Sequence, residues 1–329
     1  MRLLSRAACA VAATLFACID AHGPVAAEPA KIRVGYINNT QSAVLVNMKA
    51  FAKEGNLDID LIPFTRYPDV QRALAANSAD LGVIAPNGLP TAVAQGDRNV
   101  IAVKDLAYGG DALVVRNGVS VQKFQDLKGK RIGLAEGGIA WMMFVMLLEK
   151  NGMTYNDIQA VNFSAATDMV NAIKRGEVDA VGLWEPFVTQ TVVEGSGNIT
   201  PVVDYRETPV AALNSILGAN KAFASAHADT LVAALRTVLK SEQQLEKDNN
   251  VWVSIIRSYS NLDDATINRA LAGIHYGGPQ LSRTKLDAIA TFIGKAGIVK
   301  SDMTGKLGEN VDARFVAQAA GKSEAEVLK

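Results

Sequence analysis

The stretch KRIGLAEGGIAWMMFVMLLEKN, residues 130–151, contains the parts of a strand–loop–helix unit. Residues 131–135 carry alternating apolar side chains and predict a strand. Residues 139–148 are apolar throughout, which is too long for an ordinary strand and too short to span a bilayer. They predict a helix buried on every side, and Lys150 and Gly152 are typical of its end. The unit indicates an α/β fold.

The loop of this unit is the first candidate for function. Two glycines allow the backbone to approach another molecule closely, and a helix N-terminus directs free N–H groups at the same place. Gly137, Gly138 and Ile139 are therefore predicted to contact a ligand. A plain tight turn would explain one such loop by itself, so the prediction depends on the rest of the chain.

Composition excludes several classes of protein. The 329 residues include 33 basic and 33 acidic ones, so no broad field attracts nucleic acid or an anionic membrane. Aromatic residues make up only 6%, and no basic run is interleaved with them, so we expect no nucleic-acid binding. The length and the hydrophobic content of 49% suit two domains rather than one small one.

Residues 1–27 are typical of a secretion signal. Basic residues precede an apolar stretch at residues 7–19, and small residues favour cleavage after Ala27. We expect a soluble exported protein. The segment before Cys18 loosely resembles a lipoprotein box, which leaves lipid anchoring at that cysteine as the less favoured alternative. Because Cys9 also lies in the signal, the mature chain would have neither a disulfide nor thiol chemistry.

A repeat organises the mature chain. Residues 64–87, FTRYPDVQRALAANSADLGVIAPN, align without a gap with residues 163–186, FSAATDMVNAIKRGEVDAVGLWEP. Upstream, RVG at 33–35 parallels RIG at 131–133. The repeat predicts two similar lobes of alternating strands and helices, with chance similarity of two α/β units as the alternative.

The repeat also suggests domain boundaries. We expect residues 28–110 and 213–321 to form a discontinuous first lobe that includes the C-terminal helices. Residues 111–212 would form the second lobe, and residues 322–329 a loose tail. In open α/β sheets ligands bind at the carboxyl ends of the strands, so loops of both lobes would line a shared cleft. Two crossings between lobes permit hinge closure.

Several segments together resemble a known family: VGYINN at 34–39, FTRYPDVQRALAANSADLGV at 64–83, DALVVR at 111–116, DLKGKRIGLAEGG at 126–138 and GEVDAVGLWEPF at 176–187. They resemble the periplasmic substrate-binding proteins of ABC transporters for nitrate, sulfonate, taurine and related compounds. The same superfamily includes binders of the thiamine-precursor pyrimidine. The resemblance implies a two-lobed type II periplasmic-binding fold, a periplasmic location, a small-molecule ligand and an ABC permease in the inner membrane as partner. We expect a monomer.

The chain departs from the family's pattern where a ligand would be recognised. Sulfonate binders usually carry hydroxyl residues directly after the loop glycine, where this chain has Gly138 and Ile139, and Trp141 stands where histidine is often found. Trp184 and Glu185 lie at the family's cleft position, and a carboxylate there disfavours a bare anion. Nitrate is therefore disfavoured. Sulfonate stays open, and a flat organic ligand with a donor for Glu185 fits equally well.

The other ligand-binding candidates are polar or aromatic residues of the predicted cleft loops and crossings: Asn38, Asn39, Gln41, Arg66, Asn87, Tyr108 and Asn214. Each has a structural alternative. Trp184 could be a core residue, Glu185 a carboxylate at a helix start, and Arg66 a solvated surface cation. The repeated acids Asp69, Asp168, Asp80 and Asp179 are expected to be structural, the first two as helix caps.

An enzyme on the same fold, related to pyrimidine synthases, is the main alternative function. Those enzymes depend on histidine, iron and a cysteine-rich motif, whereas the predicted mature chain has two histidines and no cysteine. No zinc-ligand spacing, phosphate loop or nucleophile elbow occurs in the sequence. We therefore expect a binding protein without catalytic residues, cofactor or metal. A binder that serves a sensor is a third hypothesis.

Overall fold

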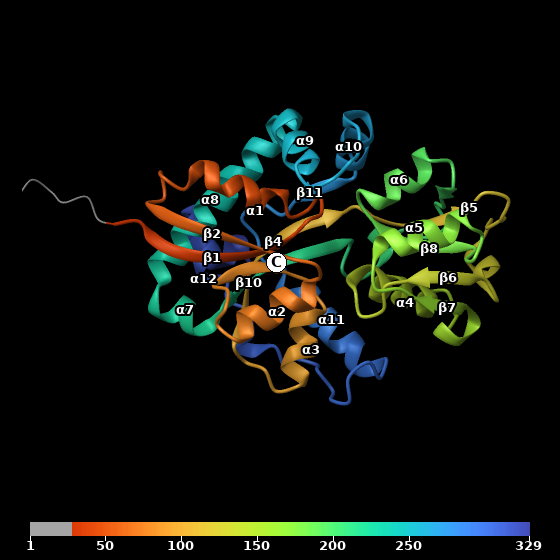
Figure 1. Cartoon of the computed structure of the whole chain (residues 1–329). Coiled ribbons are helices and arrows are strands. Elements are labelled where there is room, and N and C mark those ends of the chain that lie inside the picture. The colour runs from red at the N-terminus through yellow and green to blue at the C-terminus, as the bar shows by residue number, and fades with distance from the viewer. Residues whose placement is uncertain (1–27) are drawn as a thin grey trace, which may run out of the picture.

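The computed structural model describes residues 28–329, so the predicted signal, with Ala27 and Cys18, lies outside the described residues. Two sheets organise the fold, in the orders β11-β4-β10-β3-β1-β2 and β7-β6-β8-β5-β9. We call each sheet with its helices a lobe, and the two lobes lie side by side (Figure 1). Lobe 1 contains β1 (Ala30–Ile37), β2 (Leu57–Phe64), β3 (Leu81–Ile84), β4 (Val100–Gly109), β10 (Leu213–Asn220) and β11 (Ile274–Tyr276). Lobe 2 contains β5 (Asp111–Arg116), β6 (Arg131–Leu134), β7 (Gln159–Asn162), β8 (Ala180–Trp184) and β9 (Gly197–Ile199).

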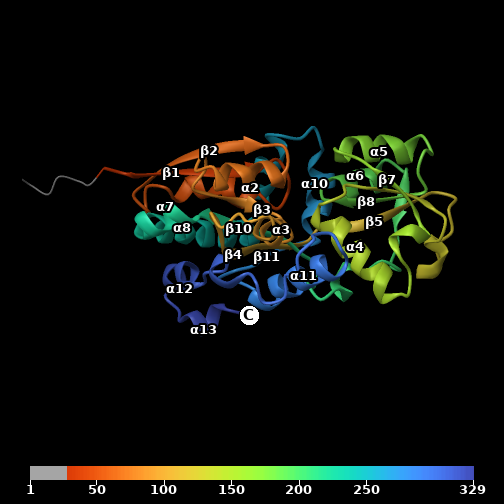
Figure 2. The same cartoon turned by 90° about the horizontal axis from the view of Figure 1, so that it is seen from below.

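Helices cover both sheets, as the α/β pattern predicted. Lobe 2 has α4 (Ile139–Lys150), α5 (Ala166–Lys174) and α6 (Phe187–Val193). The other helices are α1 (Ala43–Asn47), α2 (Tyr67–Ala75), α3 (Gly88–Ala94), α7 (Lys221–Ala226), α8 (Ala228–Lys247), α9 (Asn249–Arg257), α10 (Asp264–Leu271), α11 (Arg283–Lys295), α12 (Arg314–Ala320) and α13 (Glu324–Val327). In both views α10 lies between the lobes, where it contacts α6 (Figures 1 and 2). None of the helices within residues 28–329 has the length and apolar character needed to cross a membrane.

The two halves of the repeat build the same substructure. In lobe 1, β1 pairs in parallel with β2 and β3, and in lobe 2, β6 pairs in parallel with β7 and β8. The carboxyl ends of each parallel set therefore point to one edge of its sheet. The antiparallel strands β10 and β5 then join each set to the remaining strands.

Equivalent ion pairs hold the first strand of each set to the turn before the third. The Arg33 guanidinium donates to Asp80 at 2.6 Å, and that of Arg131 donates to Asp179 at 2.8 Å. Each aspartate also accepts the backbone N–H of its arginine. The guanidinium groups of Arg131 and Arg116 hold the pKa of the Asp179 carboxyl well below its usual range. The structural interpretation of Asp80 and Asp179 is confirmed.

The predicted capping role of Asp69 and Asp168 is wrong. The N-caps are Arg66 for α2 and Ala165 for α5, and both acids lie within the first turn instead. They still suit that place because a carboxylate near a helix N-terminus interacts favourably with the helix dipole.

Other differences arise where polar residues are buried or elements are short. The strand expected at residues 100–103 continues to Gly109, because Lys104 and Asp105 find partners in the interior. The short strands β9 and β11 give too few residues for a periodic pattern. Residues 202–203, expected to be extended, form no strand.

The segment expected to be a loose tail is ordered instead. Residues 324–327 form α13, which begins with a capping box at Ser323. Val327 is fully buried, and Leu328 forms a parallel bridge with Leu281. Two apolar side chains among charged ones were too few to reveal this contact in the sequence.

A fully buried ion pair joins β4 to α8. Lys104 Nζ donates to Glu242 Oε1 at 2.5 Å and to the Asp105 carbonyl at 2.6 Å. Burial raises the pKa of Glu242 to about 7, against the effect of Lys104. Removing one partner of such a pair leaves a buried charge without compensation.

Lys104→Met is expected to lower the free energy of unfolding by about 3–5 kcal/mol at pH 8, and by less at pH 5, where Glu242 is protonated. Chemical denaturation at both pH values measures this. Lys240→Met on the same helix is the control, since the exposed Lys240–Glu54 pair is expected to contribute at most about 1 kcal/mol. Equal losses in both variants would contradict the assignment.

Candidate functional site

Polar strand ends from the two lobes meet along one boundary, which we call the lobe seam. Its residues follow β1, β2, β3, β6 and β8 or lie at the crossings between lobes: Asn39, Thr40, Gln41, Tyr67, Gln71, Asn87, Asp111, Gly137, Ile139, Glu185 and Asn214. Asn87 Nδ2 donates to the Gly137 carbonyl at 2.7 Å, and the Thr40 hydroxyl lies 3.1 Å from the Glu185 carbonyl oxygen. The seam thus joins lobe 1 to lobe 2 directly.

A chain of hydrogen bonds crosses the seam. Asn39 Nδ2 lies 3.1 Å from the Tyr67 hydroxyl, which lies 3.2 Å from Asn214 Oδ1. Asn214 Nδ2 then donates to Asp111 Oδ2 at 2.8 Å. The chain starts on the loop after β1, passes through the first turn of α2 and ends on the first residue of lobe 2's strand β5.

Several buried polar atoms of the seam have no hydrogen-bond partner within residues 28–329. They are Asp111 Oδ1, Asn87 Oδ1 and both amide atoms of Gln71. Gln71 lies one helical turn after Tyr67 and thus on the same face of α2, and its Oε1 approaches Gly88, the neighbour of Asn87. A buried polar group without a hydrogen bond typically costs about 1–3 kcal/mol. The seam therefore has hydrogen-bonding capacity that the chain leaves unused.

Two carboxyl groups of the seam are protonated more readily than usual. Burial raises the pKa of Asp111 to about 7, against the hydrogen bond from Asn214, and the charge of Glu185 raises it further. Burial also raises the pKa of Glu185 to about 7. The Glu185 carboxylate accepts the backbone N–H and the hydroxyl of Thr189, at 3.0 and 2.8 Å, so it closes the first turn of α6. This geometry fits the structural alternative for Glu185, a carboxylate at a helix start.

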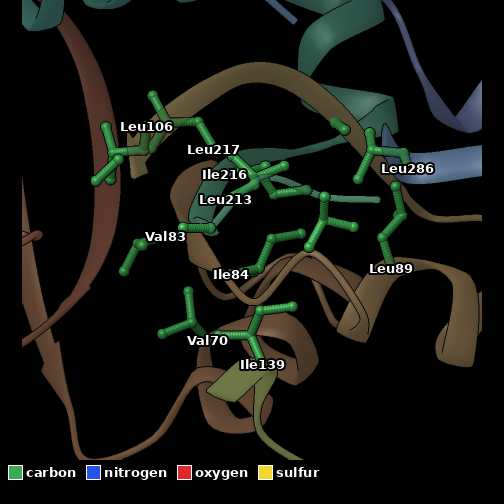
Figure 3. Close-up of a cluster of buried hydrophobic side chains, with 14 of the residues drawn as sticks. Val70, Val83, Ile84, Leu89, Leu106, Ile139, Leu213, Ile216, Leu217 and Leu286 are labelled. Atoms are coloured by element: carbon green, nitrogen blue, oxygen red, sulfur yellow. The ribbon is translucent and has the colours of Figure 1, made fainter. Parts of the chain in front are cut away.

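The glycine loop lies at the seam, as expected from its place after a strand. Gly137 has φ +83°, a conformation that glycine adopts without strain, and Gly138 is the N-cap of α4. Ile139, the first residue of α4, is buried and lies beside Val70 of lobe 1 in the apolar cluster of Figure 3. The helix start therefore packs against lobe 1 through Ile139, while Gly137 is exposed and Gly138 is half-buried.

Of the other candidates, Gln41 lies in the seam and Asn38 is exposed. The Gln41 side chain is fully buried and donates to the Gly109 carbonyl at 3.5 Å, beside the first crossing. Asn38 is exposed at the end of β1. Arg66 is also exposed, and it forms an ion pair with Asp69 at 3.5 Å.

Three aromatic candidates find partners inside their own lobes. Trp141 packs edge-on against Tyr155, with ring centroids 6.2 Å apart, and Trp184 packs in the same way on Phe187 at 6.1 Å. The Tyr108 hydroxyl donates to Asp105 at 2.5 Å. Trp184 ends β8 next to Glu185, pairs with Asp111 of β5 and is half-buried, so it adjoins the seam.

Sequence reasoning missed four seam residues: Thr40, Tyr67, Gln71 and Asp111. Asp111 had a signal, because it is a lone acid at the start of an apolar strand, directly after the glycines of the first crossing. Gln71 had none, since its neighbours Val70 and Leu74 account for the apolar face of α2 and nothing marks the glutamine as buried.

A hollow of about 930 Å³ lies elsewhere, at the opposite edge of the lobe 1 sheet. Lys31 and Asp58, which line it, stand at the amino ends of β1 and β2. Its lining mixes both charges, and the Arg33–Asp80 pair within it is satisfied. Within residues 28–329 no group of three or more histidine, cysteine or acidic residues is arranged to hold a metal. We therefore take the seam as the candidate site.

The raised pKa values predict how stability depends on pH. Folded Asp111 and Glu185 hold protons up to about pH 7, whereas their ordinary pKa values are 3.8 and 4.5. The folded state thus binds more protons across this range, and the free energy of unfolding should fall as pH rises through it. Asp111→Asn removes one titrating group while its amide oxygen can still accept from Asn214.

The variant Asp111→Asn is therefore expected to match the wild type near pH 4 and to exceed its stability increasingly above that pH, by about 1–3 kcal/mol at pH 8. Urea denaturation across this pH range measures the difference. Asp58→Asn, an exposed acid on β2, should leave the pH dependence unchanged. If Asp111→Asn follows the wild-type curve at every pH, Asp111 is not a buried titrating group.

Comparison with known proteins finds a matching family and several relatives. Residues 40–248 match the family model described as NMT1/THI5 like. A putative binding protein of Brucella abortus (strain 2308) is 32% identical over 160 residues, which cover 48% of this chain and 49% of that protein. A putative aliphatic sulfonates-binding protein of Escherichia coli (strain K12) is 26% identical over 183 residues, covering 52% and 55%. The chain thus spans about half the length of these curated relatives.

A solved structure shares the fold. The alkanesulfonate-binding protein SsuA from Xanthomonas axonopodis pv. citri, bound to MOPS, superimposes with a TM-score of 0.73 at 22% identity over 88% of this chain and 100% of that one. This likeness confirms the two-lobed periplasmic-binding fold. Since the family model spans more than half of the sequence, the chain belongs to the NMT1/THI5-like family.

Proposed function

We propose that this protein is the periplasmic solute-binding component of an ABC importer, which captures a small organic ligand between its lobes. The unused hydrogen-bonding capacity of the lobe seam carries the proposal, because buried polar atoms in a folded protein normally find partners. A ligand held between Asn87, Gln71 and Asp111 would supply the missing hydrogen-bond partners. The names of the relatives, which are binding proteins, support the same role.

The crossings between the lobes suit a hinge. Gly109 and Gly110 have φ values of +76° and +83°, and Ala211 and Ala212 have +47° and +60°. The Gly109 N–H donates to the Ala212 carbonyl at 2.9 Å, so the two crossings run side by side. Residues 111–212 would then move as one unit against residues 28–110 and 213–321, which opens and closes the seam.

Location and partner follow from the proposed role. The predicted signal would direct the chain to the periplasm, with cleavage near Ala27, and the closed form would deliver the ligand to the permease in the inner membrane. An enzyme on the same fold is the alternative. Metal analysis of the purified protein separates the two, because stoichiometric iron would favour the enzyme related to pyrimidine synthases.

We expect one small molecule per chain in native mass spectra of protein purified from the periplasm of its own host. After unfolding, dialysis and refolding, the released molecule should bind again and reduce the radius of gyration in small-angle scattering. Asn87→Ala removes the bond to Gly137 and should weaken binding roughly tenfold.

Asn117→Ala is the matched control, because Asn117 is an exposed asparagine that donates to the Gly195 carbonyl at 2.8 Å within lobe 2, and its loss should leave affinity unchanged. A radius of gyration that stays constant at saturating ligand would count against hinge closure. Equal affinity of the Asn87→Ala variant and the wild type would remove the seam as the binding site.

A further inference from the structure

We propose that Asp111 determines ligand specificity: it accepts a hydrogen bond from a nitrogen donor group of the ligand, such as an amine or amidine, and makes the seam reject oxyanions. This inference rests on the proposed binding function and adds the chemical class of the ligand. Three observations carry it: the direction of the hydrogen bonds, the identity of the unused atoms and the distribution of charge.

The direction of the hydrogen-bond chain is fixed by its first member. Asn39 Oδ1 accepts the backbone N–H of Ser42 at 2.8 Å, so the Asn39 amide nitrogen must face the Tyr67 hydroxyl. That hydroxyl then gives its own hydrogen to Asn214 Oδ1, and the Asn214 amide nitrogen faces Asp111. The hydrogen bonds of the chain therefore all run toward Asp111, whose ionised carboxylate accepts the last of them.

The unused side-chain atoms of the seam residues are mostly acceptors, and the buried Tyr205 hydroxyl near Asp111, which also has no partner within residues 28–329, can donate or accept. Asn87 must direct its amide nitrogen at the Gly137 carbonyl, which leaves Asn87 Oδ1 as an acceptor of known orientation. Asp111 Oδ1 is a second acceptor, and Gln71 provides one acceptor and one donor. A ligand that satisfies this set must present more hydrogen-bond donors than acceptors. An oxyanion presents only acceptors.

The distribution of charge at the seam also favours a ligand with donor groups over an anion. The carboxyl groups of Asp111 and Glu185 lie close enough for their charges to interact, and the phenol groups of Tyr67 and Tyr205 lie within range of the Asp111 charge. The nearby cations are Arg66, which is exposed and paired with Asp69, and Arg269, an exposed residue of α10 whose charge reaches Glu185. Among residues 28–329, an anion in the seam would meet buried acids and no buried cation.

The unfavourable burial of the Asp111 carboxylate indicates its role in ligand binding. A buried carboxylate held by one amide is unfavourable, and an ionised ligand nitrogen offers it a charge-assisted hydrogen bond. Such a bond needs the ionised carboxylate, and burial raises the pKa of Asp111 to about 7. Affinity for a cationic probe should therefore increase between pH 6 and pH 8, where a permanently cationic group stays charged.

The test uses four probes that share one ring and differ in their polar group: benzamidine, benzylamine, benzoate and benzenesulfonate. Refolded, ligand-free chains are examined by thermal shift and calorimetry at pH 6 and pH 8. We expect the two nitrogen probes to bind and raise Tm, more strongly at pH 8, and the two anions to have no effect. Asp111→Asn should weaken binding of the nitrogen probes at least tenfold and abolish the pH dependence, while Asp58→Asn leaves both unchanged.

Binding of benzenesulfonate or benzoate in preference to the nitrogen probes overturns the ligand class and leaves the binding role intact. Unchanged affinity for the nitrogen probes in Asp111→Asn overturns the role of this residue. If none of the four probes binds, the ligand class is also overturned. The native mass spectra then test the proposed function separately, because they do not depend on the choice of probe.

Discussion

The carboxyl group of Asp111 is the point on which the geometry of the seam depends. It stands where the chain enters lobe 2, directly after the glycines of the first crossing, and one of its oxygens receives the end of a hydrogen-bond chain that starts in lobe 1. Its other oxygen is buried without a partner within residues 28–329. Because a carboxylate without a buried cation is costly in the interior, the surrounding elements must either keep it protonated or bring it a donor. Both lobes contribute to this single requirement.

The internal repeat separates what supports the site from what forms it. Positions that agree between the two halves, such as Asp80 and Asp179 with their arginines, hold strands together in each lobe. Several positions that differ lie at the seam. Tyr67 corresponds to Ala166 and Gln71 to Val170, while lobe 2 has Glu185 where lobe 1 has a proline. A duplicated scaffold thus presents two different edges to one boundary, and the polar groups come from the differences.

Long apolar patterns made most of the fold predictable. The helix expected from Ile139 to Asn151 is α4, and the repeat predicted matching strand sets, because periodicity and length report burial of a continuous face. Buried polar residues defeated the same reasoning: Lys104 and Asp105 interrupted a strand that continues through them. At the site, the rule that ligands bind at strand carboxyl ends selected Asn87, Gly137 and Asn214, which lie at the seam, and their contact with a ligand stays a prediction. Trp141 and Tyr108 instead pack within their lobes, since neither pattern nor position reveals which neighbour a side chain contacts.

The crossings and the seam together set the balance between open and closed lobes. Two consecutive alanines, Ala211 and Ala212, hold left-handed backbone at the second crossing, which typically costs about 1 kcal/mol or more for each residue. The unpartnered atoms of Asp111, Asn87 and Gln71 add a further cost that is present only when the seam is closed. A few hydrogen bonds between the lobes and the packing of Ile139 on Val70 offset these costs and stabilise the closed form. A ligand that supplies donors to the seam removes the second cost and leaves the first unchanged. Closure then depends on the chemistry of the ligand, because differential interaction with the two states is the only way a ligand shifts such a balance.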